Sequence, residues 1–140
     1  MKKILIIINL FLILCGCFIS CGNNENPKSN ELYESITSQI EIYDFDVEHF
    51  ANDKIDLVKT NIKYSGIEIK GNLYQVSRYS KESEFGEITY VYVYEFELES
   101  DAQRFNQEYP QNYNPKEFYS KRKNNIVVFG NFEEIKNLSF

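Results

Sequence analysis

His49 is the only histidine of the 140-residue chain, so acid–base catalysis by an imidazole has one candidate residue. Its acidic neighbours along the sequence are Glu48 and Asp53. A Ser-His-Asp or Cys-His site also needs a nucleophile, which many hydrolases present on a Gly-x-Ser-x-Gly turn, and the sequence contains no such turn. The pattern favours a histidine on the surface of a helix.

An acidic stretch just before this histidine has the spacing of the first ligands in a calcium loop. Asp44, Asp46 and Glu48 alternate, but His49 stands where that loop needs glycine, and Ile55 stands where the bidentate glutamate belongs. A strand end or a helix cap with its acids in solvent explains the stretch more simply. The sequence therefore predicts no metal site, and it predicts no cofactor.

A second acidic row, Glu95, Glu97 and Glu99, falls on one face of a predicted strand. The basic cluster 121–123 can pair with this row if the last strand lies alongside, and such cross-strand pairs are a structural feature. A small envelope hydrolase that uses Glu95 or Glu97 together with His49 is the enzymatic alternative.

Tyr90, Tyr92 and Tyr94 alternate within 88–98, which is the strongest strand pattern of the chain. Other apolar residues of this range point to the same side, which favours a position in the core beneath helices. The alternative is an aromatic surface that binds a peptide, a glycan or another protein. These three tyrosines are the candidate binding surface.

The N-terminal segment has the character of a secretory signal. Lys2 and Lys3 precede an apolar stretch, 4–19, that is 16 residues long. A membrane-spanning helix needs about 18 residues or more. A signal peptide is therefore favoured over a permanent transmembrane anchor.

All three cysteines lie at the end of this segment. The stretch Phe18-Ile19-Ser20-Cys21 resembles the lipobox of bacterial lipoproteins, which implies that Cys21 receives the lipid and becomes the first residue of the mature protein. Leu14-Cys15-Gly16-Cys17 is a second match and makes Cys17 the alternative. Cys21 is favoured because polar chain begins directly after it.

The resemblance implies a division into a signal peptide (1–20), a flexible tether (21–29) and a single domain (30–140). It also implies an extracytoplasmic protein held at the cell membrane or the outer membrane. Two or more acyl chains anchor a protein stably, whereas one chain binds only marginally. Gly22, in place of the aspartate that retains some lipoproteins in the inner membrane, favours the outer membrane.

The net charge and the cysteine content further restrict which partners and which kinds of site are expected. The chain has a formal charge of −6, and removal of Lys2 and Lys3 leaves 13 basic against 21 acidic side chains, or −8. Such a surface disfavours nucleic acid as a partner. The mature chain keeps too few cysteines for a disulfide framework or a zinc site, so packing must stabilise the domain.

Apolar periodicity predicts the elements of this domain. Helices are expected from Pro27 to about Tyr43, from Val47 to Gly66, from Ser100, as a capping box, to Pro110, and after Asn131. Strands are expected over 67–79, 88–98 and 126–129, with a hairpin loop at 81–86.

This order predicts an α+β fold with two layers, a mainly antiparallel sheet and helices on one face. The unit from Tyr90 to Phe129 would place the last strand parallel to the tyrosine-rich strand. In that respect the chain resembles half of a ferredoxin-like fold, which implies nothing about function.

Together these patterns predict a lipid-anchored module of the cell envelope that binds an envelope protein or an external ligand and is not an enzyme. The alternatives are the small hydrolase and an immunity or exclusion lipoprotein that blocks an incoming agent at the membrane.

Overall fold

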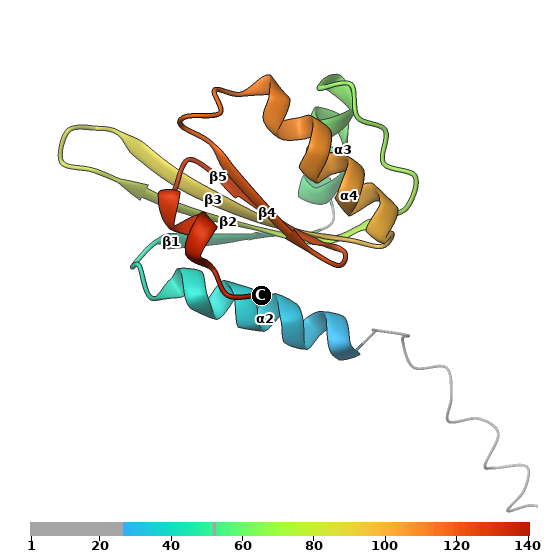
Figure 1. Cartoon of the computed structure of the whole chain (residues 1–140), viewed down its shortest axis with the longest axis horizontal. Coiled ribbons are helices and arrows are strands. Elements are labelled where there is room, and N and C mark those ends of the chain that lie inside the picture. The colour runs from blue at the N-terminus through green and yellow to red at the C-terminus, as the bar shows by residue number, and fades with distance from the viewer. Residues whose placement is uncertain (1–26, 52) are drawn as a thin grey trace, which may run out of the picture.

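The computed structural model describes residues 27–51 and 53–140, which fold around one five-stranded sheet (Figure 1). The strand order is β1-β2-β3-β5-β4, and each neighbouring pair is antiparallel. In chain order the strands are β1 (Asp46–Phe50), β2 (Leu73–Glu82), β3 (Ile88–Phe96), β4 (Tyr119–Lys123) and β5 (Ile126–Gly130). The predicted α+β class and antiparallel sheet are confirmed.

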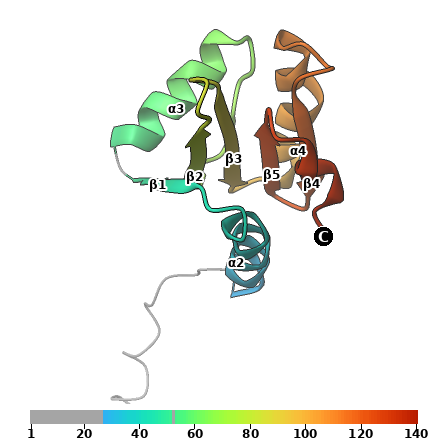
Figure 2. The same cartoon turned by 90° about the vertical axis from the view of Figure 1, so that its left-hand side faces the viewer.

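Helices cover both faces of this sheet (Figures 1 and 2). α3 (Asp53–Tyr64) and α4 (Glu99–Glu108) share one face, as the two-layer prediction requires. α2 (Pro27–Glu41) packs on the opposite face with the short 3₁₀ helix η2 (Glu133–Asn137). α2 takes this position because β3 is apolar on both sides, with valines towards α2 and aromatic rings towards α3 and α4. It begins at Pro27, within the stretch predicted as tether.

β1 occupies a stretch whose spacing suggests the start of a helix. That expectation was wrong for Asp46–Phe50, which pairs along β2, and the helix begins only at Asp53. The same residues also alternate, so Glu48 and Phe50 turn towards α3. The free edge of β2 offers backbone hydrogen bonds, and this tertiary partner decides in favour of a strand.

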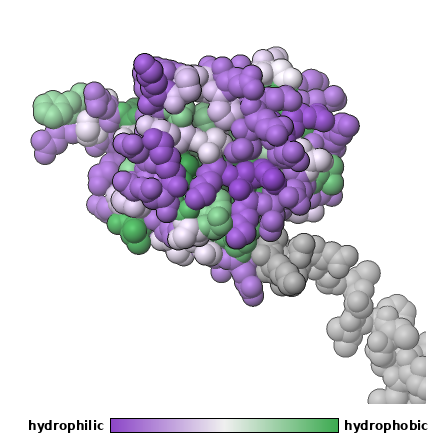
Figure 3. Space-filling model, in the orientation of Figure 1, coloured by the Kyte–Doolittle hydropathy of each residue, from purple (hydrophilic) through white to green (hydrophobic). Residues whose placement is uncertain are grey.

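β3 shows the predicted alternation, and its exposure falls from its beginning to its end. Its beginning, at Ile88, is 58% exposed, whereas Glu95 near its end is 3% exposed. The β2–β3 hairpin projects beyond the sheet, and apolar surface appears near its tip (Figure 3), where Phe85 is 91% exposed. Glu95 is tolerated inside because Gln75 Nε2 donates a hydrogen bond to its Oε2 at 2.6 Å.

The predicted strand 126–129 exists as β5, but it is antiparallel to β3. The sequence interpretation was wrong here because it predicted no strand at Tyr119–Lys123, which forms β4 and reverses the chain into β5. β3 and β4 do run in the same direction, with β5 between them. β5 packs so closely on β3 that a Cβ on Gly130 would lie 2.1 Å from the Tyr90 carbonyl oxygen.

Two expected helix starts differ in their capping. α4 begins at Glu99 with Leu98 as its N-cap and no side-chain cap, so Ser100 lies inside the helix and does not cap it. Asn131 does not begin a helix. Its side chain joins β3 instead, accepting from the Tyr90 amide at 2.7 Å and donating to the Ile88 carbonyl at 2.9 Å. No helix within the described ranges is long and apolar enough to cross a bilayer.

Candidate functional site

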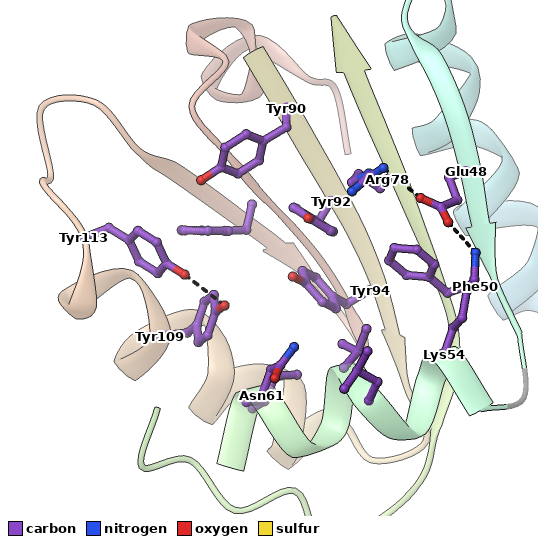
Figure 4. A pocket seen from close by; sticks show the side chains of 14 residues that line it. Glu48, Phe50, Lys54, Asn61, Arg78, Tyr90, Tyr92, Tyr94, Tyr109 and Tyr113 are labelled. Carbon is purple, nitrogen blue, oxygen red and sulfur yellow. Dashed lines mark hydrogen bonds and ion pairs between the residues drawn. The ribbon is translucent and has the colours of Figure 1, made fainter. Parts of the chain in front are cut away.

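A pocket of about 380 Å³ opens on the face of the sheet that carries α3 and α4 (Figure 4). Its floor comes from β3 and β5, one wall from α3 and the neighbouring strands β1 and β2, and the other from the 3₁₀ turn η1 (Tyr109–Asn112) that follows α4. The lining residues are Glu48, Phe50, Lys54, Leu57, Val58, Asn61, Ile62, Arg78, Tyr90, Tyr92, Tyr94, Tyr109, Tyr113 and Phe129.

Strand geometry places three of its tyrosines in a row. Side chains two positions apart on a strand share one face, so Tyr90, Tyr92 and Tyr94 follow one another along the floor. The Tyr92 and Tyr94 rings stack with their centroids 5.7 Å apart, and Tyr90 meets Tyr92 edge to face at 5.6 Å. This row is the aromatic ladder that the alternation predicts, and it is core at one end and pocket floor at the other.

Two further tyrosines come from the segment after α4. Tyr109 stacks on the buried Phe105 ring at 4.4 Å, and Tyr113 packs against Phe129 at 5.0 Å. The Tyr113 hydroxyl donates to the Tyr109 hydroxyl at 3.0 Å. The pocket therefore brings together five phenol groups from two distant parts of the chain.

The floor tyrosines differ from this pair in their hydrogen bonding. Within the described residues, the hydroxyls of Tyr90, Tyr92 and Tyr94 make no hydrogen bond, and neither does the side-chain amide of Asn61 on α3. The hydroxyl of Tyr94 is not sealed in the core, although the residue as a whole is only 4% exposed. Neutral donors and acceptors thus remain free to meet a ligand.

The pKa values of three pocket tyrosines, Tyr90, Tyr94 and Tyr109, are raised, so these phenols stay protonated at neutral pH. Burial raises the pKa of Tyr90 to about 12, and the neighbouring Tyr113 and Tyr92 add to the shift. Burial also holds the pKa of Tyr94 well above its usual range. The pKa of Tyr109 is raised by burial first and then by its hydrogen bond with Tyr113.

Charged side chains gather on the side of the pocket away from Tyr109 and Tyr113 (Figure 4). Glu48 accepts a hydrogen bond from Lys54 Nζ at 2.5 Å and forms an ion pair with Arg78 Nη2 at 2.8 Å. The hydrogen bond from Lys54 is the main cause that lowers the pKa of Glu48. One carboxylate between two cations leaves one net positive charge at this rim.

The residues of the hydrolase alternative do not lie on this pocket. His49 is on the α2 side, where its Nδ1 lies 2.8 Å from Ser77 Oγ, and β2 separates its strand from the one that carries Glu95. Strand spacing puts the Cα atoms of His49 and Glu95 roughly 10 Å apart or more. Glu97 accepts from the Asn72 amide at 2.7 Å. The structure therefore does not bring these three side chains together.

The other acidic and basic candidates have structural contacts. Of the row that includes Glu99, only Glu99 meets the basic cluster, through Arg122 Nη1 at 3.0 Å. Asp44 takes a positive φ of 58° in the turn before β1, and Lys81 Nζ lies 4.0 Å from it. In the part of the chain that the structure describes, no three His, Cys, Asp or Glu residues form a cluster suited to a metal ion.

Sequence reasoning missed several lining residues. Arg78 faces Glu48 in the β1–β2 register, a pairing that only knowledge of β1 could reveal. Tyr113 lies in an irregular stretch without periodicity, whereas Tyr109 falls within the helix expected up to Pro110. Cys21 and Cys17 lie outside the described residues.

The chain matches no model of a known protein family, and neither a curated protein nor a solved structure shows significant similarity to it.

Proposed function

We propose that this chain is a lipid-anchored module of the bacterial envelope that binds a small ligand in the tyrosine-lined pocket. The observation that carries the proposal is the set of floor hydroxyls, on Tyr90, Tyr92 and Tyr94, that have no partner among the described residues and line a hollow of about 380 Å³. Buried or half-buried polar groups normally find partners, so groups left free around a cavity favour a ligand that supplies them.

Binding is favoured over the hydrolase alternative because the polar groups that converge are phenols, an amide and a neutralised carboxylate. Glu48 is engaged with both Lys54 and Arg78, and His49 belongs to the other side of the sheet. Such a set suits recognition better than proton transfer, which needs an acid or base free to exchange protons with a substrate.

The anchor part of the proposal rests on the lipobox-like stretch that ends in Cys21. We expect metabolic labelling with a fatty acid to mark the wild-type protein and Cys17→Ala, and to be lost in Cys21→Ala. Loss of the label in Cys17→Ala alone would move the anchor to the earlier motif. Labelling of neither wild type nor variants would contradict a lipid anchor.

Blocking the pocket tests the binding part. Asn61→Trp puts an indole into the space from α3, whereas Lys63→Trp adds the same group to an exposed position on the same helix that does not line the pocket. The full-length proteins, purified in detergent, are incubated with the low-molecular-mass fraction of a bacterial envelope and examined by native mass spectrometry.

Wild type and Lys63→Trp are expected to retain a small molecule that Asn61→Trp does not. Equal retention by all three proteins, or retention by none, would contradict a binding function for this pocket.

A further inference from the structure

We infer that the ligand of this pocket is a sugar ring that carries a carboxylate, with the ring on the tyrosine floor and the carboxylate at the Lys54–Arg78 rim. The inference rests on the proposed function, because it names the chemical class that the same pocket selects. It follows from three properties of the lining: flat rings, neutral hydrogen-bonding groups and an uneven distribution of charge.

The floor suits a ring with apolar faces and a polar edge. The faces of aromatic side chains carry negative charge density, so they attract the weakly positive C–H groups on the face of a sugar. Tyr92 and Tyr94 stack on each other at an interplanar angle of 20°, so this contact takes up part of their ring surface and the rest faces the pocket. The volume of about 380 Å³ lies at the small end of ligand sites, which span about 300–1,000 Å³.

The free polar groups match the hydroxyls of such a ring. Each tyrosine hydroxyl can donate one hydrogen bond and accept others, and the Asn61 amide can do both. A wholly apolar ligand would cover these groups without replacing their bonds to water, which is unfavourable. A ligand with several hydroxyl groups at its edge satisfies them.

The rim adds a preference for negative charge. Glu48 offsets only one of the two cations beside it, so the side of the pocket at Lys54 and Arg78 is positive although the whole chain carries −6. Tyrosine cages often bind quaternary ammonium groups, but here a cation would meet two like charges. The phenols of Tyr90, Tyr94 and Tyr109, whose pKa values are raised, stay neutral and do not repel an anion.

Binding of simple probes tests this assignment. Full-length protein in detergent is titrated calorimetrically with glucuronate, glucose and tetramethylammonium. Glucuronate is expected to bind about tenfold more tightly than glucose, the difference made by a charge-assisted hydrogen bond. Tetramethylammonium is expected not to bind.

Variants separate the two ends of the pocket. Lys54→Gln and Arg78→Gln should bring glucuronate to within about twofold of glucose, since only the acid uses the rim. Tyr92→Phe should weaken both sugars by about threefold, because it removes one hydroxyl and keeps the ring. The matched controls Lys63→Gln and Tyr74→Phe, at positions off the pocket lining, should change neither. Lys54 has an exposed side chain, so its variant stays informative if Arg78→Gln fails to fold.

Three outcomes would overturn the inference. Equal affinity for glucose and glucuronate, unchanged in Lys54→Gln, removes the role of the rim. Tighter binding of tetramethylammonium makes the pocket an aromatic cage for cations. If wild type retains a natural ligand that is not an acidic sugar, and Asn61→Trp does not retain it, the ligand class is refuted. The proposed function then still stands. The proposed function itself fails only if Asn61→Trp retains the ligand as well as wild type does, or if none of the proteins retains a small molecule.

Discussion

The two faces of the sheet are packed in different ways, although the same strands supply both. On the α2 face, the Tyr33 hydroxyl is paired with Ser77 Oγ at 2.7 Å, whereas the hydroxyl of the fully buried Tyr79 has no hydrogen-bond partner among the described residues. Beside Tyr79, the centre of that core consists mainly of fully buried aliphatic side chains. They are Ile36, Ile40, Val91, Val93, Ile126 and Val128.

On the opposite face, rings dominate and the space is not filled. Phe105 and Phe129 are buried, but Tyr90 and Tyr92 are only partly covered, and their hydroxyls meet no other described residue. α3 and α4 stand over the two halves of this face (Figure 2), and the pocket lies between α3 and the turn after α4.

The difference indicates that the two faces of the sheet have different roles, one in stability and one in binding. Branched aliphatic side chains interdigitate and close a core, so the α2 face stabilises the fold. Large flat rings span the gap between two helices without filling it, and they leave hydroxyls at its surface. We therefore expect substitutions on the α2 face mainly to lower the free energy of unfolding, and substitutions on the pocket face mainly to weaken ligand binding.

Alkaline pH is expected to have the largest effect, because buried tyrosines lie on both faces. Burial raises the pKa of Tyr33 and Tyr79 on the α2 face, and of Tyr90, Tyr94 and Tyr109 on the pocket face. In the unfolded chain a tyrosine ionises near a pH of about 10, so above that pH the unfolded chain loses protons that the folded chain keeps.

These tyrosines thus leave stability intact below a pH of about 10 and reduce it as the pH rises further. For Tyr90 the loss continues up to its folded pKa of about 12. Circular dichroism and phenolate absorbance, recorded together, should show unfolding and the late ionisations at the same pH. Complete ionisation near pH 10, at about the unfolded value, with the secondary structure intact would show that neither face buries its phenols.

The next largest effect is expected when an aliphatic side chain is shortened, which should destabilise the protein more on the α2 face than on the pocket face. Ile36 on the α2 face is 0% exposed, whereas Leu57 at the pocket rim is 61% exposed. Ile36→Ala is expected to lower the free energy of unfolding by about 3 kcal/mol, since it leaves a cavity in a closed core. Leu57→Ala should cost less than about 1 kcal/mol. Urea unfolding of both variants measures the difference, and equal losses would break the comparison.

A matched pair of hydroxyl deletions sharpens the contrast. Tyr33→Phe removes a hydroxyl that is bonded to Ser77 and should cost about 1–2 kcal/mol of stability. Tyr92→Phe removes a hydroxyl without a partner among the described residues and should be neutral to within about 0.5 kcal/mol. If Tyr92→Phe proves as costly as Tyr33→Phe, its hydroxyl is engaged within the protein and the pocket is not free.

The smallest effect is expected at the charged rim. Lys54 has a side chain that is 61% exposed, and an exposed ion pair stabilises a fold by about 0–1 kcal/mol. Lys54→Gln should therefore leave the free energy of unfolding within about 0.5 kcal/mol of wild type, while it abolishes the preference for an acidic sugar. A large loss of stability would make the ion pair with Glu48 structural.

Periodicity in the sequence predicts the elements whose own residues bury a face. The stripe Leu32, Ile36 and Ile40 marks α2, and the alternating tyrosines mark β3, because each pattern is long enough to distinguish a period of 3.6 from a period of 2. Over the five residues of β1 the two periods cannot be separated. There the decision comes from the edge of β2, a partner about 30 residues away in the register.

β4 and the pocket depend even more on tertiary pairing. Lys121, Arg122 and Lys123 show no apolar alternation, but charged residues are typical of an edge strand, where both faces remain partly in water. The row of tyrosines was visible in the sequence as a candidate surface. The sequence alone does not show that Arg78 and Glu48 lie beside these tyrosines, because their position depends on the pairing of two strands and on the placement of α3.

The most direct test of the account maps binding onto the two faces. The full-length protein is labelled with ¹³C in its tyrosine rings and titrated with glucuronate while the ring signals are followed by NMR. The account predicts that the signals of Tyr90, Tyr92, Tyr94, Tyr109 and Tyr113 shift with one affinity and that those of Tyr33 and Tyr79 do not. Unchanged pocket signals at saturating glucuronate, or equal shifts on both faces, would contradict it.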